Sequence, residues 1–207
     1  MTSPRKEPTI SEAGSELKRA GDLAHDRERA WDLVCRHVQN PALRRHMLAV
    51  ETVMRAYAAS FDDDVERFGV TGLLHDFDWE IHPNADEHPE LGCRMLEEMG
   101  YPADVVTAIR GHATYLKIPR DTLLAQALFA SDELTGFITA VVYVRPSKSI
   151  HEVTVESVKK KLKDKRFAAN VNREEIEQGA REFGVDLDDH IGFVINALRN
   201  NAGPLGL

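Results

Sequence analysis

The stretch TGLLHDFDWEIHP, residues 71–83, places His75 and Asp76 side by side directly after an apolar run. A helix usually stops on Gly or Asn, which tolerate a left-handed backbone, and not on an adjacent imidazole and carboxylate. Two explanations fit this pair of side chains. Either the pair caps and fixes a turn, or it holds a ligand that needs nitrogen and oxygen donors together.

The composition is that of an ordinary folded domain. The chain has 207 residues, of which 43% are hydrophobic and 29% are charged, and a chain of this length can bury a substantial core. No stretch approaches the ~20 apolar residues that a membrane span needs, and the polar N-terminus lacks the apolar core of a signal peptide. Only Cys35 and Cys93 are present, which favours a reducing compartment. We therefore expect a cytoplasmic protein without a membrane partner.

The charge of the chain is unevenly distributed. The formal net charge of −8 argues against general nucleic-acid binding, which relies on Lys and Arg. Between Arg145 and Arg166 eight basic residues stand against three acidic ones, so this segment carries +5 and leaves −13 for the rest of the chain. The simplest interpretation of such a run is a solvated helix face.

Apolar spacing and helix punctuation predict an all-α protein. After a flexible N-terminal tail at residues 1–25, helical patterns alternate with short turns rich in Pro, Gly and Asn. The β-branched run FITAVVYV (137–144) could also form a strand, but no partner strand is apparent. We expect a helical bundle with its core at residues 26–150 and a C-terminal helical extension, 151–207, packed on the same domain. The predicted helices are 27–39, 41–61, 64–74, 86–100, 101–113, 120–144, 154–162, 172–184 and 187–200.

Two polar residues interrupt the apolar faces of predicted helices. His46 falls within the core stripe of the second helix, and Asp132 falls within the buried side of the long helix. Each alone has a structural explanation, as a satisfied core histidine or a buried hydrogen-bond acceptor, although an isolated buried carboxylate is costly. Together with His75 and Asp76 they make a mixed nitrogen and oxygen site for a divalent cation. Such a cation offsets the burial of both carboxylates.

Two further histidines stand at predicted helix boundaries. His88 begins the segment HPELGCRML, and His112 ends the segment AIRGHA. Capping or turn chemistry explains both positions. The alternative is that the two side chains turn into a central cleft and bind a second metal ion, bridged to the first through Asp76.

The order His46, then His75-Asp76, then Asp132 resembles the H…HD…D signature of the HD superfamily of metal-dependent phosphohydrolases. The resemblance covers about residues 41–145. Its neighbouring segments match as well: RRHMLAVETVM, VTGLLHDFDWE and LFASDELTGFI.

The additional histidines carry a more specific resemblance. His88 and His112 resemble those of the dimetal branch of the superfamily, which includes HD-type diadenosine tetraphosphate hydrolases. There are also departures. Phe77-Asp78 follows the doublet where the family's namesake variant has Ile-Gly, and the glycine-tyrosine-proline signature of cyclic-di-GMP phosphodiesterases does not occur. Beyond about residue 150 no motif matches.

The resemblance implies metal-dependent hydrolysis of a phosphoester or phosphoanhydride bond in a small phosphorylated molecule, with a nucleotide as the expected class. One or two ions of Mn, Fe, Co, Ni or Zn suit histidine and carboxylate ligands. Asp76 would bridge the ions and help to hold the nucleophile, and Asp78 or Glu80 is a candidate general base or acid. The alternative for these two is a loop carboxylate that pairs with Arg or caps a turn. The implied metal ligands are His46, His75, Asp76, His88, His112 and Asp132.

Three basic residues are candidate contacts for the substrate phosphate. Arg145 and Lys148 lie in the segment VRPSKSI, and Arg matches phosphate oxygens bidentately. Thirteen residues of helix would nevertheless separate Arg145 from Asp132 by about 20 Å, so a break near Gly136 or a loop folding back is required. Arg110 lies two residues before His112, although it can also point to solvent.

Two other hypotheses compete with the enzyme. The first is a non-catalytic HD module that binds metal or nucleotide as a sensor or interaction domain. The second is a structural helical bundle with buried His–Asp pairs, which predicts no stoichiometric metal. A homo-oligomer is an open alternative to a monomer, with residues 151–207 as one candidate dimer surface.

Overall fold

The computed structural model describes residues 23–207, and this part of the chain contains ten α-helices, three short 3₁₀ helices and no strand. The prediction of an all-α protein is confirmed. The expected tail, residues 1–25, lies outside the described residues except for its last three, which form the 3₁₀ turn η1 (Leu23–His25). No described helix is long and apolar enough to cross a membrane.

The helices follow the predicted order with small changes at their ends. They are α2 (Arg27–His37), α3 (Pro41–Ser60), α4 (Val65–Leu74), α5 (Glu90–Met99), α6 (Ala103–His112), α7 (Leu123–Tyr143), α8 (Val155–Leu162), α9 (Arg173–Phe183), α10 (Leu187–Asn200) and α11 (Ala202–Leu205), with η2 (Thr114–Leu116) after α6 and η3 (Ile150–Glu152) after α7.

The residues at the helix ends explain these boundaries. Asn40 caps α3 by accepting from the backbone N–H of Ala42, and Pro41 occupies the first turn, where its missing N–H costs nothing. Thr122 caps α7 in the same manner. Helix α5 ends at Gly100, whose φ of 87° is readily available only to glycine. Local sequence therefore decides where these helices begin and end.

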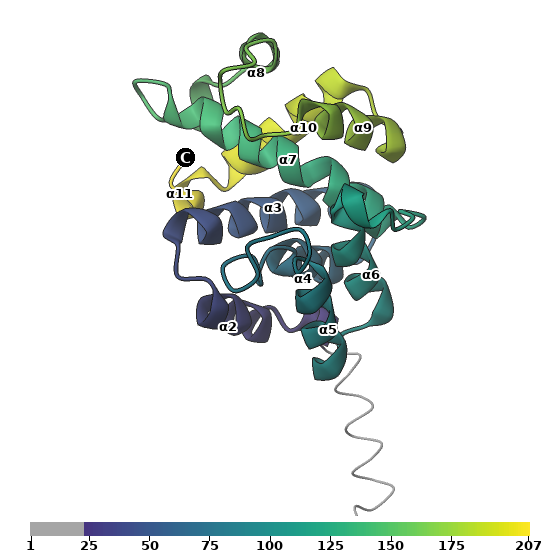
Figure 1. The fold of residues 1–207 in the computed structure, drawn as a ribbon. Helices are drawn as coiled ribbons and strands as arrows, with labels where there is room; N and C mark the ends of the chain where they lie inside the picture. Colours follow the sequence, from purple (N-terminus) through teal and green to yellow (C-terminus); the bar gives the residue numbers. More distant parts are fainter. Residues whose placement is uncertain (1–22) are drawn as a thin grey trace, which may run out of the picture.

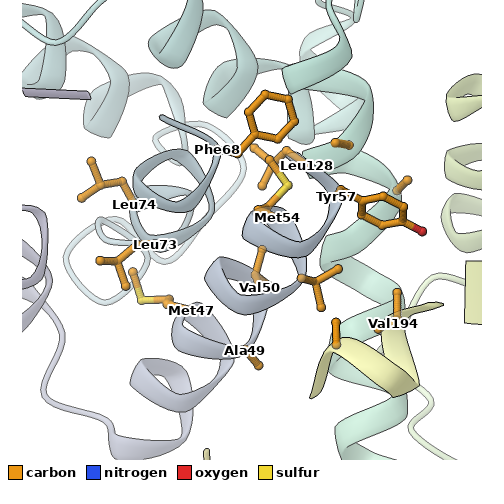
Figure 2. Packing of buried hydrophobic residues seen from close by; sticks show 14 of the residues in the cluster. Met47, Ala49, Val50, Met54, Tyr57, Phe68, Leu73, Leu74, Leu128 and Val194 are labelled. Atoms are coloured by element: carbon orange, nitrogen blue, oxygen red, sulfur yellow. The ribbon is translucent and has the colours of Figure 1, made fainter. Parts of the chain in front are cut away.

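The hydrophobic core surrounds α3. Its buried side chains face α4, α7 and α10. Figure 2 shows Leu73 and Leu74 of α4 on one side of α3 and Val194 of α10 on the other. Because the core is contiguous from Leu23 to Leu205, the C-terminal helices share it with the rest of the fold.

Helix α7 is continuous from Leu123 to Tyr143. The alternative of a strand at 137–144 is wrong, because this run continues the buried face of a helix that began fourteen residues earlier. Gly136 does not interrupt the helix. This continuity carries the end of α7 away from Asp132.

Helices α8 and α9 lie on the opposite side of α7 from α2, α4 and α5 (Figure 1). Helix α9 packs directly on α7, and a Cβ atom on Gly179 would lie only 2.7 Å from the Cα of Ala130. Helix α10 adds a buried hydrogen-bonded chain. Tyr57 donates its hydroxyl proton to Nδ1 of His190 over 2.5 Å, and Nε2 of His190 donates to the Ala130 carbonyl over 2.8 Å. These contacts join α3, α7, α9 and α10 into one body.

Candidate metal centre

Side chains from distant parts of the chain meet where α3, α4, α6 and α7 converge. Each comes from a helix or from a turn that directly follows or precedes one. His46 lies on α3, His75 ends α4, Asp76 follows it, His88 precedes α5, His112 ends α6 and Asp132 lies on α7.

The first group of donor atoms centres on His75. Its Nε2 lies 3.2 Å from Nε2 of His46 and 3.4 Å from both Oδ1 of Asp132 and Oδ2 of Asp76. Nε2 of His46 lies 2.9 Å from the same Asp132 oxygen and 3.9 Å from the same Asp76 oxygen. Two donors that each bind a tetrahedral ion at ~2.1 Å are separated by about 3.4 Å. The spacing therefore suits a shared cation.

The second group lies on the other side of Asp76. Nε2 of His88 lies 3.3 Å from Nε2 of His112. Oδ1 of Asp76 is 3.4 Å from the His88 nitrogen and 3.6 Å from the His112 nitrogen. Because Oδ2 of Asp76 faces the first group and Oδ1 faces the second, this carboxylate lies between the two groups in the manner of a bridging ligand.

Hydrogen bonds at Nδ1 fix the orientation of three of the rings. Nδ1 of His75 lies 2.7 Å from the Gly72 carbonyl, and Nδ1 of His112 lies 2.6 Å from the Ile109 carbonyl. Nδ1 of His88 lies 2.8 Å from a carboxylate oxygen of Asp78. Carbonyl and carboxylate oxygens only accept, so each Nδ1 donates, and Nε2 of a neutral ring keeps its lone pair. This is the arrangement that metal-binding histidines adopt in proteins.

The buried carboxylates of Asp76 and Asp132 require positive charge close to them. Burial alone would lower the pKa of His75, but the negative charges of Asp76 and Asp132 raise that pKa well above its usual value. Burial would raise the pKa of both carboxyl groups, yet the neighbouring histidines hold the pKa of Asp76 and of Asp132 well below the usual range. The pKa of His112 is raised through Asp76, against the effect of burial.

The residues present therefore fit a divalent metal ion. With neutral rings, the Nε2 lone pairs of His75, His88 and His112 face carboxylate oxygens, and no hydrogen atom lies between them. Either ring protons or a bound cation must supply the missing positive charge. Nitrogen and carboxylate donors suit Mn, Fe, Co, Ni and Zn. Two triads satisfy the spacing for one ion each: His46, His75 and Asp76, and Asp76, His88 and His112.

A pocket of about 350 Å³ opens over these donor atoms. Its lining includes His46, Asp76, His88, His112 and Asp132, so five of the six candidate metal ligands face this pocket, whereas His75 is fully buried. The walls come from residues that sequence reasoning missed as parts of a site: Trp79, Ala113, Thr114, Tyr115, Glu133, Gly136, Val171 and Glu175.

Asp78 and Glu80, predicted as acid or base candidates, lie outside this lining. Asp78 is 1% exposed and accepts from Nδ1 of His88 and from the backbone N–H of Gly92 at 3.1 Å. The carboxylate of Glu80 accepts from the backbone N–H groups of Gln39 and Asn40 at 2.6 and 2.7 Å. Asp78 orients a candidate ligand, and Glu80 fixes the turn between α2 and α3. These contacts match the alternative expectation of carboxylates that hold neighbouring groups in place.

The predicted phosphate contacts also lie outside the lining. Arg110 pairs with Glu90 at 2.8 Å and with Glu97 at 2.9 Å. Arg145 lines a different pocket, beside Lys160 and Lys161 of α8, because α7 runs unbroken to Tyr143. Lys148 is exposed in the following turn. Arg110, Arg145 and Lys148 therefore do not line the pocket over the candidate metal ligands.

Among the pocket residues that the sequence analysis did not identify, Glu133 had a local sequence signal and Glu175 had none. Glu133 directly follows Asp132, and burial followed by the negative charges of Asp132 and Glu175 raises its pKa to about 8. Its position beside a candidate ligand was a usable signal. Glu175 reaches the pocket from α9, in a segment without any motif, and its position depends on how α9 packs on α7.

Comparison with known proteins identifies the segment that contains the centre. No curated protein and no solved structure gave a significant match. Residues 43–136 match the family model of the HD domain, and this range contains His46, His75, Asp76, His88, His112 and Asp132. Its fold is the all-helical one found here, with the match beginning in α3 and ending within α7. The chain therefore carries an HD domain at residues 43–136.

Proposed function

We propose that this protein is a divalent-metal-dependent phosphohydrolase that cleaves a phosphoester or phosphoanhydride bond in a small phosphorylated molecule. The observation that carries the proposal is the position of Asp76, whose two carboxylate oxygens face two separate pairs of histidines. This arrangement favours two ions and membership of the dimetal branch of the superfamily.

The side chains of the protein supply the metal ligands and keep them oriented, and the pocket gives a substrate access to them. His46, His75 and Asp132 hold one ion and His88 and His112 the other, with Asp76 shared. When bound, such ions make hydroxide available near neutral pH and neutralise charge on phosphoryl oxygens. The Nδ1 hydrogen bonds of His75, His88 and His112 keep the ring nitrogens pointed at the centre without further rearrangement. Asp78 acts through His88 as a positioning residue.

The family resemblance favours a nucleotide as the substrate. The exposed rings of Trp79 and Tyr115 line the pocket, and aromatic rings of this kind stack on bases. No Lys or Arg lines the pocket in the described part of the chain. Nucleotides with a single phosphate are therefore better candidates than diphosphates or triphosphates.

The test is turnover by protein that has been stripped of metal and reconstituted with Mn, Fe, Co, Ni or Zn in turn. The panel contains nucleotides, dinucleoside polyphosphates and generic phosphoesters. We expect phosphate release that depends on metal, with a stoichiometry of two ions per chain. Metal and nucleotide binding without turnover would instead support a sensor or interaction module. A protein that binds no stoichiometric metal would be a structural bundle, and the proposal would be wrong.

A further inference from the structure

The outer wall of the candidate metal pocket is acidic and aromatic. Glu133 of α7 and Glu175 of α9 line it together with Trp79 and Tyr115. Within residues 23–207, no Lys or Arg contributes to the lining. Any part of a substrate that extends beyond the metal centre therefore meets negative charge and aromatic rings.

The two carboxyl groups are held in place by neutral donors. Glu175 carries a charge that no neighbouring cation of the described residues compensates, whereas burial and the negative charges of Asp132 and Glu175 raise the pKa of Glu133 to about 8, so Glu133 ionises readily only when a cation lies beside it. Glu175 accepts from the Thr114 hydroxyl at 2.7 Å, and Glu133 accepts from the backbone N–H of Asn172 at 3.3 Å. Both donors are neutral, and each carboxylate keeps a second oxygen for a ligand. No ion pair to either carboxylate occurs in the described part of the chain.

Arg120 and Arg173 bind other partners. Arg120 binds Glu182 at 2.6 Å and the Gly111 carbonyl at 2.8 Å. The guanidinium of Arg173 donates to the carbonyls of Phe167, Ala168 and Val171 and lies over an aromatic ring. Neither guanidinium is available to the outer wall, so among the described residues no Lys or Arg supplies it with a positive charge, and a ligand can.

The aromatic side chains are also fixed. The Tyr115 hydroxyl donates to the His88 carbonyl at 2.6 Å, while its ring remains 46% exposed. Trp79 packs edge-on against the His88 ring, with 4.9 Å between centroids, and is 41% exposed. Carboxylates beside exposed aromatic rings form a favourable environment for an ammonium group, which gains charge-assisted hydrogen bonds and cation–π contacts.

We propose that this outer wall selects phosphorylated substrates whose organic part carries a protonated amine. Glu175 provides the counter-charge, Glu133 adds to it because the ammonium group favours its ionised form, and Trp79 and Tyr115 flank the ammonium group. The inference rests on the proposed function, because the phosphoryl group is expected at the metal centre. It also disfavours polyphosphates, since additional phosphates would face the two carboxylates.

The experiment compares two esters that differ in one charge, 2-aminoethyl phosphate and propyl phosphate. Their affinities for the metal-loaded protein are measured by calorimetry, and their kcat/KM values by phosphate release. We expect the ammonium ester to be preferred by about tenfold, the size of one charge-assisted hydrogen bond. Glu133→Gln and Glu175→Gln should each remove most of this preference. Glu174→Gln, an exposed neighbour on α9 outside the pocket, is the matched control.

The outcomes separate the two proposals. Equal affinity for both esters, or an equal preference for adenosine monophosphate over propyl phosphate, would overturn the inference and leave phosphohydrolase activity intact. A preference in binding that depends on Glu175, without turnover of any ester, would overturn the proposed function alone. Loss of a metal ion from both Gln variants would assign the carboxylates to metal binding and overturn the inference. The ratio measured for the unmodified protein tests the idea without any variant.

Discussion

His88 donates from Nδ1 to Oδ1 of Asp78 over 2.8 Å, and this hydrogen bond directs its Nε2 toward Oδ1 of Asp76, 3.4 Å away. The carboxylate of Asp78 is almost fully buried and is held in turn by the backbone N–H of Gly92. Carboxylates in this position fix the ring and raise the basicity of the ligand nitrogen. Asp78 therefore acts on the second group of ligands only.

Replacing Asp78 with Asn should weaken the second metal site and leave the first in place. Asn keeps the shape of the side chain but removes the charge that supports His88, and such a change costs roughly 10- to 100-fold in metal affinity. Metal titration of the variant should show one tight and one weakened site. The exposed loop residue Asp86 provides the control, as Asp86→Asn. Equal weakening of both sites would contradict this assignment.

Replacing Asp76 with Asn should impair both sites at once, because its two oxygens face different groups. Turnover should fall by at least about a hundredfold, since metal affinity and water activation both suffer. The comparison is His88→Ala, which should lower metal stoichiometry while the first site stays occupied. Activity like that of the unmodified protein in Asp76→Asn would exclude the proposed mechanism.

Metal binding should weaken as the pH falls, starting above pH 6.5. The pKa of His75 and of His112 is raised in the metal-free protein, so protons compete with metal at a pH higher than they would for an ordinary imidazole. Calorimetric titration between pH 8 and pH 6 should show falling affinity and proton release on binding. A pH-independent affinity over this range would show that the rings are neutral before metal binds.

His190 should make the folding stability of the protein fall as the pH drops below 6.5. Burial lowers its pKa below the usual value of 6.5, so the unfolded chain takes up a proton that the folded chain refuses. Stability is fully present above pH 6.5 and is lost as the pH falls from there toward the folded-state pKa, by up to about 1.4 kcal/mol per pH unit. Denaturant unfolding of His190→Gln, measured at several pH values, should lack this component. Parallel curves for the two proteins would rule out the buried neutral histidine.

Residue type and local context together indicated several side chains that the structure brings close to one another. His46 and Asp132 were identified because each interrupts an apolar helix face, and their side chains do approach His75 and Asp76 closely. Local periodicity also favoured one long helix over a strand at 137–144, and the structure agrees. These features depend on neighbours within one or two helical turns.

Other roles depended on contacts between distant segments. Glu80 appeared available for proton transfer, but its partners lie some forty residues earlier, at Gln39 and Asn40. Glu175 could not be identified, because no motif marks it and only the packing of α9 on α7 brings it to the pocket. Short-range patterns cannot report which surface a distant helix will cover.

The close approach of Gly179 to Ala130 has a consequence for how substrate choice is organised along the chain. This contact seats α9 on α7, so a segment outside the HD match supplies part of the pocket wall. The pocket wall is thereby encoded in two stretches of sequence, with Trp79, Tyr115 and Glu133 inside the HD match and Glu175 outside it. Exchanging residues 151–207 for a different helical segment that docks on the same glycine-sized gap should redirect specificity while the metal-binding residues stay untouched. The C-terminal helices would then determine part of the substrate specificity, while the candidate metal ligands stay the same.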